Sequence, residues 1–107
     1  MRIAIFGMGA WGTALAQAFS AIHEVKLWGR EADHVAELRA TRKNQRYLPG
    51  IVLNADITPV ATIDEASDGA DLYLIATPFA GLRETVRALR HQPDRPLIWA
   101  CKGLEAG

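Results

Sequence analysis

The feature that most constrains this sequence is a glycine-rich turn between an apolar run and an amphipathic segment. Residues 2–6 have the composition of a strand buried on both faces of a parallel sheet, and residues 10–21 have a helical period. The turn between them has G-x-G-x-x-G spacing and reads Gly7-Met8-Gly9-Ala10-Trp11-Gly12. Residues 25–28 form a second apolar run. Strand, helix and strand together have the length of a βαβ crossover, which predicts two parallel neighbouring strands.

The rest of the chain continues this alternation. A Thr-x-x-Glu capping box starts a brief helix at Thr62, and Pro59 places its own strand at a sheet edge because proline cannot donate to a ladder. The pattern predicts an α/β fold, a Rossmann-type doubly wound parallel sheet truncated after its fifth strand, with strand order 3-2-1-4-5. The remaining predicted elements are a helix at 31–42, a loop insertion between Lys43 and Asp56, a strand at 57–60, a central strand at 72–76, a helix at 79–90 and a strand at 97–101.

Each predicted helix has a face that can cover the sheet. The first presents Leu15, Ala18, Phe19 and Ile22, the second a thinner set of Ala32, Val35, Ala36 and Leu38, and the last Leu82, Val86 and Leu89. Two histidines, His23 and His34, are predicted to be solvated turn and helix residues, and His91 is predicted to be a cation at a helix end. We therefore assign no chemistry to them.

Composition bounds the functional class. The chain has 107 residues, so it can form at most one domain. Its 12 basic and 12 acidic side chains balance, so no long-range electrostatic field attracts nucleic acid or an anionic membrane. The apolar stretch near the N-terminus is shorter than the ~20 residues of a membrane span. A single cysteine, Cys101, favours a reducing, cytoplasmic location, and no histidine, cysteine or carboxylate cluster has metal-ligand spacing. The chain stops just after its fifth strand, so we expect a fragment of a longer protein.

The glycine turn predicts a dinucleotide site. In a βαβ unit the first glycine permits the tight turn, the second lets a pyrophosphate approach the backbone, and the third lets helix and strand pack closely. Residues 1–107 are accordingly the N-terminal part of a dinucleotide-binding domain. A Walker A loop is excluded because no Gly-Lys-Ser/Thr follows. The alternative is a glycine-rich turn without a ligand.

A residue near the end of the second strand indicates which dinucleotide is bound. An acidic side chain there usually meets the ribose of NAD, but this chain has Arg30, whose cationic fork suits a 2′-phosphate. NADP is therefore preferred, and NAD remains allowed because Glu31 alongside can weaken the preference. A solvated loop arginine is the alternative.

Loops at the carboxyl ends of the other strands share the same rim. Phe79 can flank the cofactor, although packing at a helix start explains it equally well. Lys102 stands just past the last strand, where an ammonium can meet a substrate phosphate or polarise a carbonyl. A solvated lysine is the alternative.

Over its whole length the chain resembles the bacterial-type NAD(P)-dependent glycerol-3-phosphate dehydrogenases. The segments that carry the likeness are Gly7 to Ala16, Val25 to Arg30, the loop Arg46-Tyr47-Leu48-Pro49-Gly50, and Lys102-Gly103-Leu104-Glu105. The resemblance implies an oxidoreductase that exchanges a hydride between a nicotinamide cofactor and sn-glycerol 3-phosphate, giving dihydroxyacetone phosphate, and that supplies phospholipid precursors.

The resemblance also implies roles for single residues. Trp11 and the backbone around Ala10 would line the pyrophosphate, Arg30 would meet the adenosine end, and Tyr47 would border the cofactor. Lys102 would lie where nicotinamide and substrate meet. The family often has serine in place of Ala10 and threonine in place of Cys101, and we expect both departures to tune the site.

The family's second half is a helical domain that supplies a lysine general acid/base and most of the substrate phosphate site. That domain is not in this chain, so we expect these residues alone to bind cofactor weakly and not to turn over. A homodimer of the full-length protein is consistent with the resemblance. Two other functions stay open: another dehydrogenase of the 3-hydroxyacid type, and a non-catalytic dinucleotide-sensing module.

Overall fold

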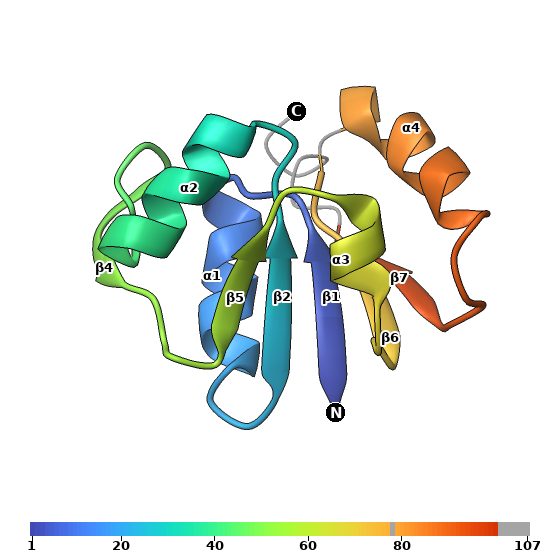
Figure 1. The fold of residues 1–107 in the computed structure, drawn as a ribbon, viewed down its shortest axis with the longest axis horizontal. Coiled ribbons are helices and arrows are strands. Elements are labelled where there is room, and N and C mark those ends of the chain that lie inside the picture. Colours follow the sequence, from blue (N-terminus) through green and yellow to red (C-terminus); the bar gives the residue numbers. More distant parts are fainter. Residues whose placement is uncertain (78, 101–107) are drawn as a thin grey trace.

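The computed structural model describes residues 1–77 and 79–100, with the side chains of residues 79 and 80 outside the described part. Its centre is a five-stranded parallel sheet in the order β5-β2-β1-β6-β7, with helices on both faces (Figure 1). This confirms the predicted doubly wound sheet and its strand order. The strands are β1 (Arg2–Phe6), β2 (Glu24–Trp28), β5 (Ile57–Val60), β6 (Leu72–Ile75) and β7 (Leu97–Trp99), and the helices are α1 (Ala10–Phe19), α2 (Ala32–Thr41), α3 (Ile63–Ser67) and α4 (Phe79–Leu89).

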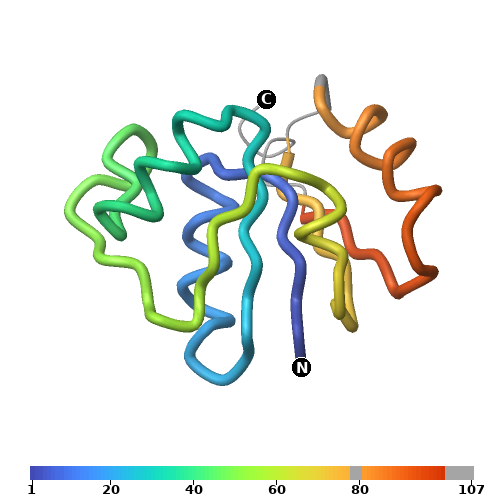
Figure 2. Tube along the Cα trace, in the orientation of Figure 1, coloured from blue at the N-terminus to red at the C-terminus, as the bar shows by residue number. Residues whose placement is uncertain are grey.

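Alternate side chains of β1 divide the core into two layers. Ile3 and Ile5 belong to the layer that α1 and α2 cover, whereas Ala4 and Phe6 belong to the layer that α3 and α4 cover. Because both faces of the sheet are covered, the sequence of β1 is apolar without interruption from Ile3 to Phe6. The chain starts at the amino edge of the sheet and reaches the glycine turn at the opposite edge (Figure 2).

The position of β6 agrees with the prediction. The strand expected at 72–76 lies inside the sheet, between β1 and β7, as the predicted order requires. Burial on both faces gives β6 its apolar composition, and the strand next to an edge shares that burial with the middle one.

The buried face of α1 differs from the prediction. Ala18 is exposed, and Ile22, beyond the helix end, is 80% exposed. The residues turned toward the sheet are small: a Cβ added to Gly12 would lie 1.9 Å from the Gly7 carbonyl oxygen, and Ala16 is completely buried. The helix therefore lies too close to the sheet for a ridge of bulky side chains, and Leu15 and Phe19 pack beside that contact.

The segment predicted as a loop between Lys43 and Asp56 contains a small second sheet. Strand β3 (Lys43–Asn44) pairs antiparallel with β4 (Leu48–Val52), with a register shift between Lys43 and Asn44. The two strands are short and irregular, so they leave no alternating pattern in the sequence.

Strand β5 is an edge strand, which confirms the prediction made from Pro59. The Ile57 N–H donates to the Asn54 carbonyl at 3.1 Å, and the Ile57 carbonyl accepts from Arg42 Nη2 at 2.8 Å. Pro59 has no N–H, and its carbonyl accepts from Arg39 Nε at 2.7 Å. These two residues therefore have their backbone polar groups satisfied on the side away from β2.

Two predicted helices on the other face are confirmed. Thr62 caps α3, with its Oγ1 accepting from the Glu65 N–H at 3.1 Å, as a capping box requires. On α4, Leu82, Val86 and Leu89 pack against the second core layer. The strand predicted at 97–101 is seen as β7, while Cys101 lies outside the described residues.

Across residues 1–77 and 79–100, no helix combines the length and the apolar content needed to cross a membrane.

Candidate functional site

A cavity of about 670 Å³ lies at the carboxyl ends of β1, β2 and β6. This volume falls within the ~300–1,000 Å³ of small-molecule and cofactor sites. The glycine turn after β1 forms its floor. One wall comes from the start of α2 with Tyr47, and the other from residues of α4. Of the predicted site residues, the cavity brings together Gly7, Gly9, Ala10, Arg30 and Tyr47.

The glycine turn has the geometry that a ligand approaching its backbone requires. Gly7 has φ +129°, and a Cβ there would lie 2.8 Å from the Ala76 carbonyl carbon, so the turn is pressed against the residue that follows β6. At Gly9, by contrast, an added Cβ would meet no atom of the described residues within 4 Å. The second glycine therefore faces open space, where a side chain would occupy the cavity.

Polar groups at the cavity lack protein partners. Gly9 caps α1 with no side-chain hydrogen bond, and the first turn of α1 contains no acidic residue. The first amides of a helix have no intrahelical acceptor, so this end favours an anion. Within the described residues, the buried hydroxyl oxygen of Thr77 also has no hydrogen-bond partner. A ligand with phosphate and hydroxyl groups fits these needs.

The start of α2 provides the cation that the sequence predicts. Arg30 is exposed, lines the cavity and makes no ion pair or hydrogen bond with any part of the chain that the structure describes. Glu31 is paired instead with Arg46, with Nη1 3.1 Å from Oε2. This hydrogen bond is the main cause of an Arg46 pKa above its ordinary value. The acidic neighbour of Arg30 is thus engaged elsewhere.

Two of the other predicted site residues, Trp11 and Gly12, are not among those that line the cavity. Trp11, 37% exposed, lies in the first turn of α1, and Gly12 is buried beneath that turn. Phe79 begins α4, but its side chain is outside the described part, and Lys102 lies wholly outside it.

The interpretation of His34 as a solvated helix residue is wrong. His34 is only 5% exposed and lines the cavity, and its Nε2 lies 2.9 Å from Asn44 Oδ1. Ala32 and Ala36, expected to pack, are exposed, whereas Val35 and Leu38 are buried as predicted. The segment of β3 and β4 covers α2 from the side of His34 and removes it from water. Sequence analysis missed His34, Asn44 and Thr77, because no local pattern places them at the site.

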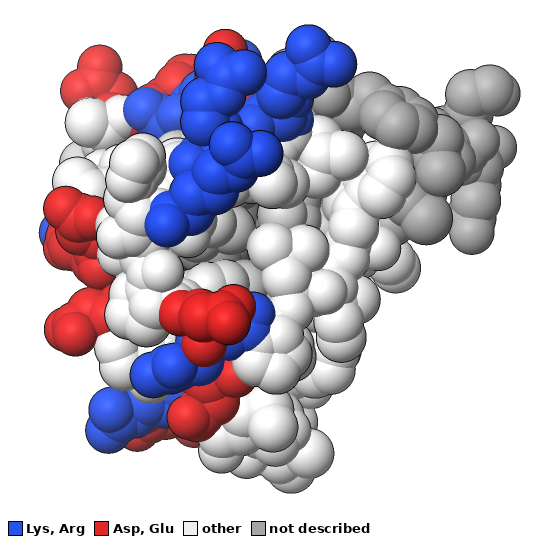
Figure 3. Space-filling model, turned by 90° about the vertical axis from the view of Figure 1, so that its right-hand side faces the viewer, with Lys and Arg blue, Asp and Glu red and all other residues white. Residues whose placement is uncertain are grey.

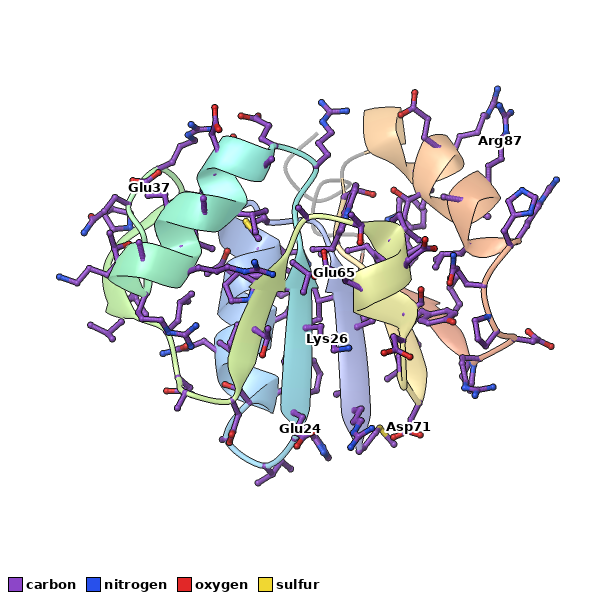
Figure 4. The ribbon with its side chains drawn as sticks, in the orientation of Figure 1. Glu24, Lys26, Glu37, Glu65, Asp71 and Arg87 are labelled. Atoms are coloured by element: carbon purple, nitrogen blue, oxygen red, sulfur yellow. The ribbon has the colours of Figure 1, made fainter. Side chains whose placement is uncertain are left out.

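A second hollow of about 420 Å³ lies at the amino ends of the strands. Both of its basic side chains have partners: Arg2 Nε lies 3.0 Å from Glu24 Oε2, and Lys26 Nζ donates to the carbonyls of Glu65 and Asp68. Figure 4 shows Lys26 on β2 below Glu65, with Glu24 and Asp71 at the amino edge. No group of three or more potential metal ligands occurs in the described ranges.

The cavity thus combines an open glycine turn with an arginine that has no partner among the residues described, and comparison of the sequence with known families agrees with these features. Residues 2–107 match the model for the NAD-dependent glycerol-3-phosphate dehydrogenase N-terminus. The chain belongs to this family. It is 60% identical to the glycerol-3-phosphate dehydrogenase [NAD(P)+] of Aromatoleum aromaticum and 46% identical to that of Dechloromonas aromatica, over its full length in both cases. It spans about a third of the length of these relatives, 33% of each.

Solved structures of glycerol-3-phosphate dehydrogenases have the same fold. The glycerol-3-phosphate dehydrogenase of Coxiella burnetii matches with a TM-score of 0.86 and 32% identity, over 95% of this chain and 34% of that one. The yeast glycerol-3-phosphate dehydrogenase matches with a TM-score of 0.85 and 19% identity, over 95% of this chain and 33% of that one. The yeast match is evidence for the fold alone.

Proposed function

We propose that residues 1–107 are the N-terminal part of the dinucleotide-binding domain of an NAD(P)-dependent glycerol-3-phosphate dehydrogenase. This enzyme would interconvert sn-glycerol 3-phosphate and dihydroxyacetone phosphate in the cytoplasm, as a step in phospholipid precursor supply. The observation that carries the proposal is the open position at Gly9, at an uncapped helix end that faces the cavity. The names of the relatives, glycerol-3-phosphate dehydrogenase [NAD(P)+], support the cofactor and substrate class.

In this proposal the chain's own residues bind and orient the dinucleotide. The first amides of α1 donate to its pyrophosphate, and the unpartnered Thr77 hydroxyl donates to an oxygen of the same ligand. When bound, the nicotinamide ring supplies the hydride acceptor or donor. The glycine turn after β1 packs against Ala76, the residue after β6, and this contact keeps the donors fixed before the ligand arrives.

Arg30 decides between the two cofactors in this proposal. Its guanidinium has no partner in the described part of the chain, while Glu31 is held by Arg46, so the site favours a 2′-phosphate. NADP is therefore the preferred cofactor, with NAD also accepted. Trp11, Tyr47 and Phe79 flank the cofactor, and Lys102 meets the substrate.

The general acid/base and most of the substrate site belong to a helical domain outside residues 1–107. We expect the purified chain to bind NADPH but to show no turnover with dihydroxyacetone phosphate. A measured rate with the chain alone would contradict the assignment of the general acid/base to that second domain.

The decisive experiment is a calorimetric titration of the chain and of Gly9→Val with NADPH. Because a Cβ at Gly9 meets no atom of the described residues within 4 Å, the variant should keep its melting temperature, while its side chain fills the phosphate position and weakens binding at least about tenfold. Ala18→Val, on the exposed side of the same helix, is the matched control and should bind normally. Normal NADPH affinity in Gly9→Val would contradict the proposed site.

A further inference from the structure

A buried amide ties the glycine turn to the wall of the cavity. Asn44, in β3, is completely buried, and a buried polar side chain is costly unless it is hydrogen-bonded. Its Nδ2 donates to the Met8 carbonyl at 2.9 Å and to Thr13 Oγ1 at 2.8 Å, and its Oδ1 lies 2.9 Å from His34 Nε2. One side chain therefore connects the β1–α1 turn, α1 and α2.

The chemistry of the partners fixes the orientation of this amide. A backbone carbonyl such as that of Met8 can only accept, so the NH₂ group of Asn44 must face it. The Asn44 oxygen then faces His34, whose Nε2 must carry the proton and donate. Asn44, Met8 and His34 thus form one directed chain of donors and acceptors.

Met8 is the residue between the two glycines that shape the turn. Its carbonyl is held by Asn44, and its side chain is buried against Gly29, where an added Cβ would lie 2.8 Å from the Met8 sulfur. Fixing Met8 at both ends fixes the direction of the amides that follow at Gly9 and Ala10.

Through His34, the same amide also contacts the wall of the cavity that α2 forms. His34 lines the cavity on α2, and its ring centroid lies 5.6 Å from that of Tyr47. Asn44 therefore sets the distance between the glycine turn and the wall that carries Arg30.

We propose that Asn44 is a positioning residue for dinucleotide binding, which holds the amides of the glycine turn aimed into the cavity before the ligand arrives. The inference rests on the proposed function. Preorganisation of this kind contributes to affinity because the bound geometry does not have to be ordered on binding. Asn44 touches no ligand itself and acts through Met8 and, with Thr13, through the start of α1.

The main test is Asn44→Asp, which keeps the shape of the side chain and an acceptor for His34 but removes both donors to the turn. Dissociation constants are measured by calorimetry for NADPH and for adenosine 2′-phosphate, which has the 2′-phosphate but no pyrophosphate. We expect NADPH binding to weaken about tenfold, and adenosine 2′-phosphate binding to change less than about twofold.

The matched control is Asn54→Asp. Asn54 also donates through Nδ2 to two groups of the α1 segment, the Gln17 carbonyl and Ser20 Oγ, but at the helix end far from the cavity. It should lower stability without changing NADPH affinity in the folded protein.

A second pair keeps the test decisive if Asn44→Asp does not fold. Thr13→Val removes the hydroxyl that accepts from Asn44, and Thr13→Ser keeps it. The valine variant should weaken NADPH binding several-fold and the serine variant should restore it, with circular dichroism confirming that both fold.

Two results overturn the inference alone: folded variants that bind NADPH as tightly as the parent, or a parallel weakening of both ligands that follows the loss of melting temperature. A parent chain that folds but binds neither NADPH nor NADH overturns the proposed function, and the inference with it.

Discussion

The two hollows at opposite edges of the same sheet differ in whether their basic side chains have partners in the described residues. At the amino edge, Arg2 pairs with Glu24, and Lys26 donates to two carbonyls at the end of α3. At the carboxyl edge, Arg30 and the Thr77 hydroxyl have no partner within the described residues. Figure 3 shows where the charges lie on the α4 side: a group of Lys and Arg lies toward the carboxyl edge, and both signs of charge are mixed toward the amino edge.

This difference teaches that a hollow in the surface is not by itself a site. Polar groups that the protein satisfies contribute to stability, whereas groups left without partners are available to a ligand. Substitutions at the amino edge should therefore change the melting temperature but not binding, and substitutions at the carboxyl edge the reverse.

The largest effect is expected from Lys26→Met at the amino edge. The variant keeps the apolar stem but removes both hydrogen bonds to α3, which should cost about 2 kcal/mol and lower the melting temperature by roughly 10 °C. NADPH affinity should not change. Lys43→Met, whose ammonium has no hydrogen bond or ion pair in the described residues, is the control in a thermal melt.

Arg30→Ala at the carboxyl edge should act on binding alone. We expect NADPH affinity to fall about tenfold and NADH affinity to stay unchanged, because only NADPH carries the 2′-phosphate. The measurement is titration calorimetry with both cofactors, and Arg87→Ala, on the outer side of α4, is the control (Figure 4). Equal weakening of both cofactors would show that Arg30 does not recognise the 2′-phosphate.

Thr77→Val sharpens the comparison with a nearly isosteric change. The hydroxyl has no protein partner to lose, so thermal stability should be kept or rise slightly, while NADPH binding should weaken about threefold. Thr58→Val, in the lining of the amino-edge hollow, should leave binding unchanged. A drop in the stability of Thr77→Val without any change in affinity would reverse the assignment.

Arg2→Gln should have the smallest effect. The Arg2 and Glu24 side chains are 64% and 68% exposed, and exposed ion pairs contribute at most about 1 kcal/mol. A small fall in melting temperature that disappears in high salt, with normal NADPH binding, is the expected result. A change in NADPH affinity would break the division between the two edges.

The fold was predictable from sequence to the extent that it depends on local patterns. The apolar runs, the glycine turn, the capping box at Thr62 and the edge proline each act through neighbours in sequence, and each element they predict is present. The face of α1 was not predictable from bulky residues, because Gly12 and Ala16 make the closest contacts.

The site was predictable only in part for the same reason. Glycine spacing identifies Gly9, and a basic residue just beyond the end of β2 identifies Arg30. The burial of His34, however, depends on Asn44, which lies ten positions further along the chain and in another element. No periodicity connects an asparagine in β3 with the carbonyl of Met8 across 36 positions.

The outer side of β5 has a consequence for how this protein behaves when crowded. Another molecule that adds a strand to a sheet needs unpaired N–H and C=O groups, and at Ile57 and Pro59 the chain offers none, since Asn54, Arg42 and Arg39 already occupy them. Intermolecular strand addition, the usual first step toward polymers of folded sheets, is blocked on this flank by Arg39 of α2, by Arg42 just after that helix, and by the lack of an N–H at Pro59.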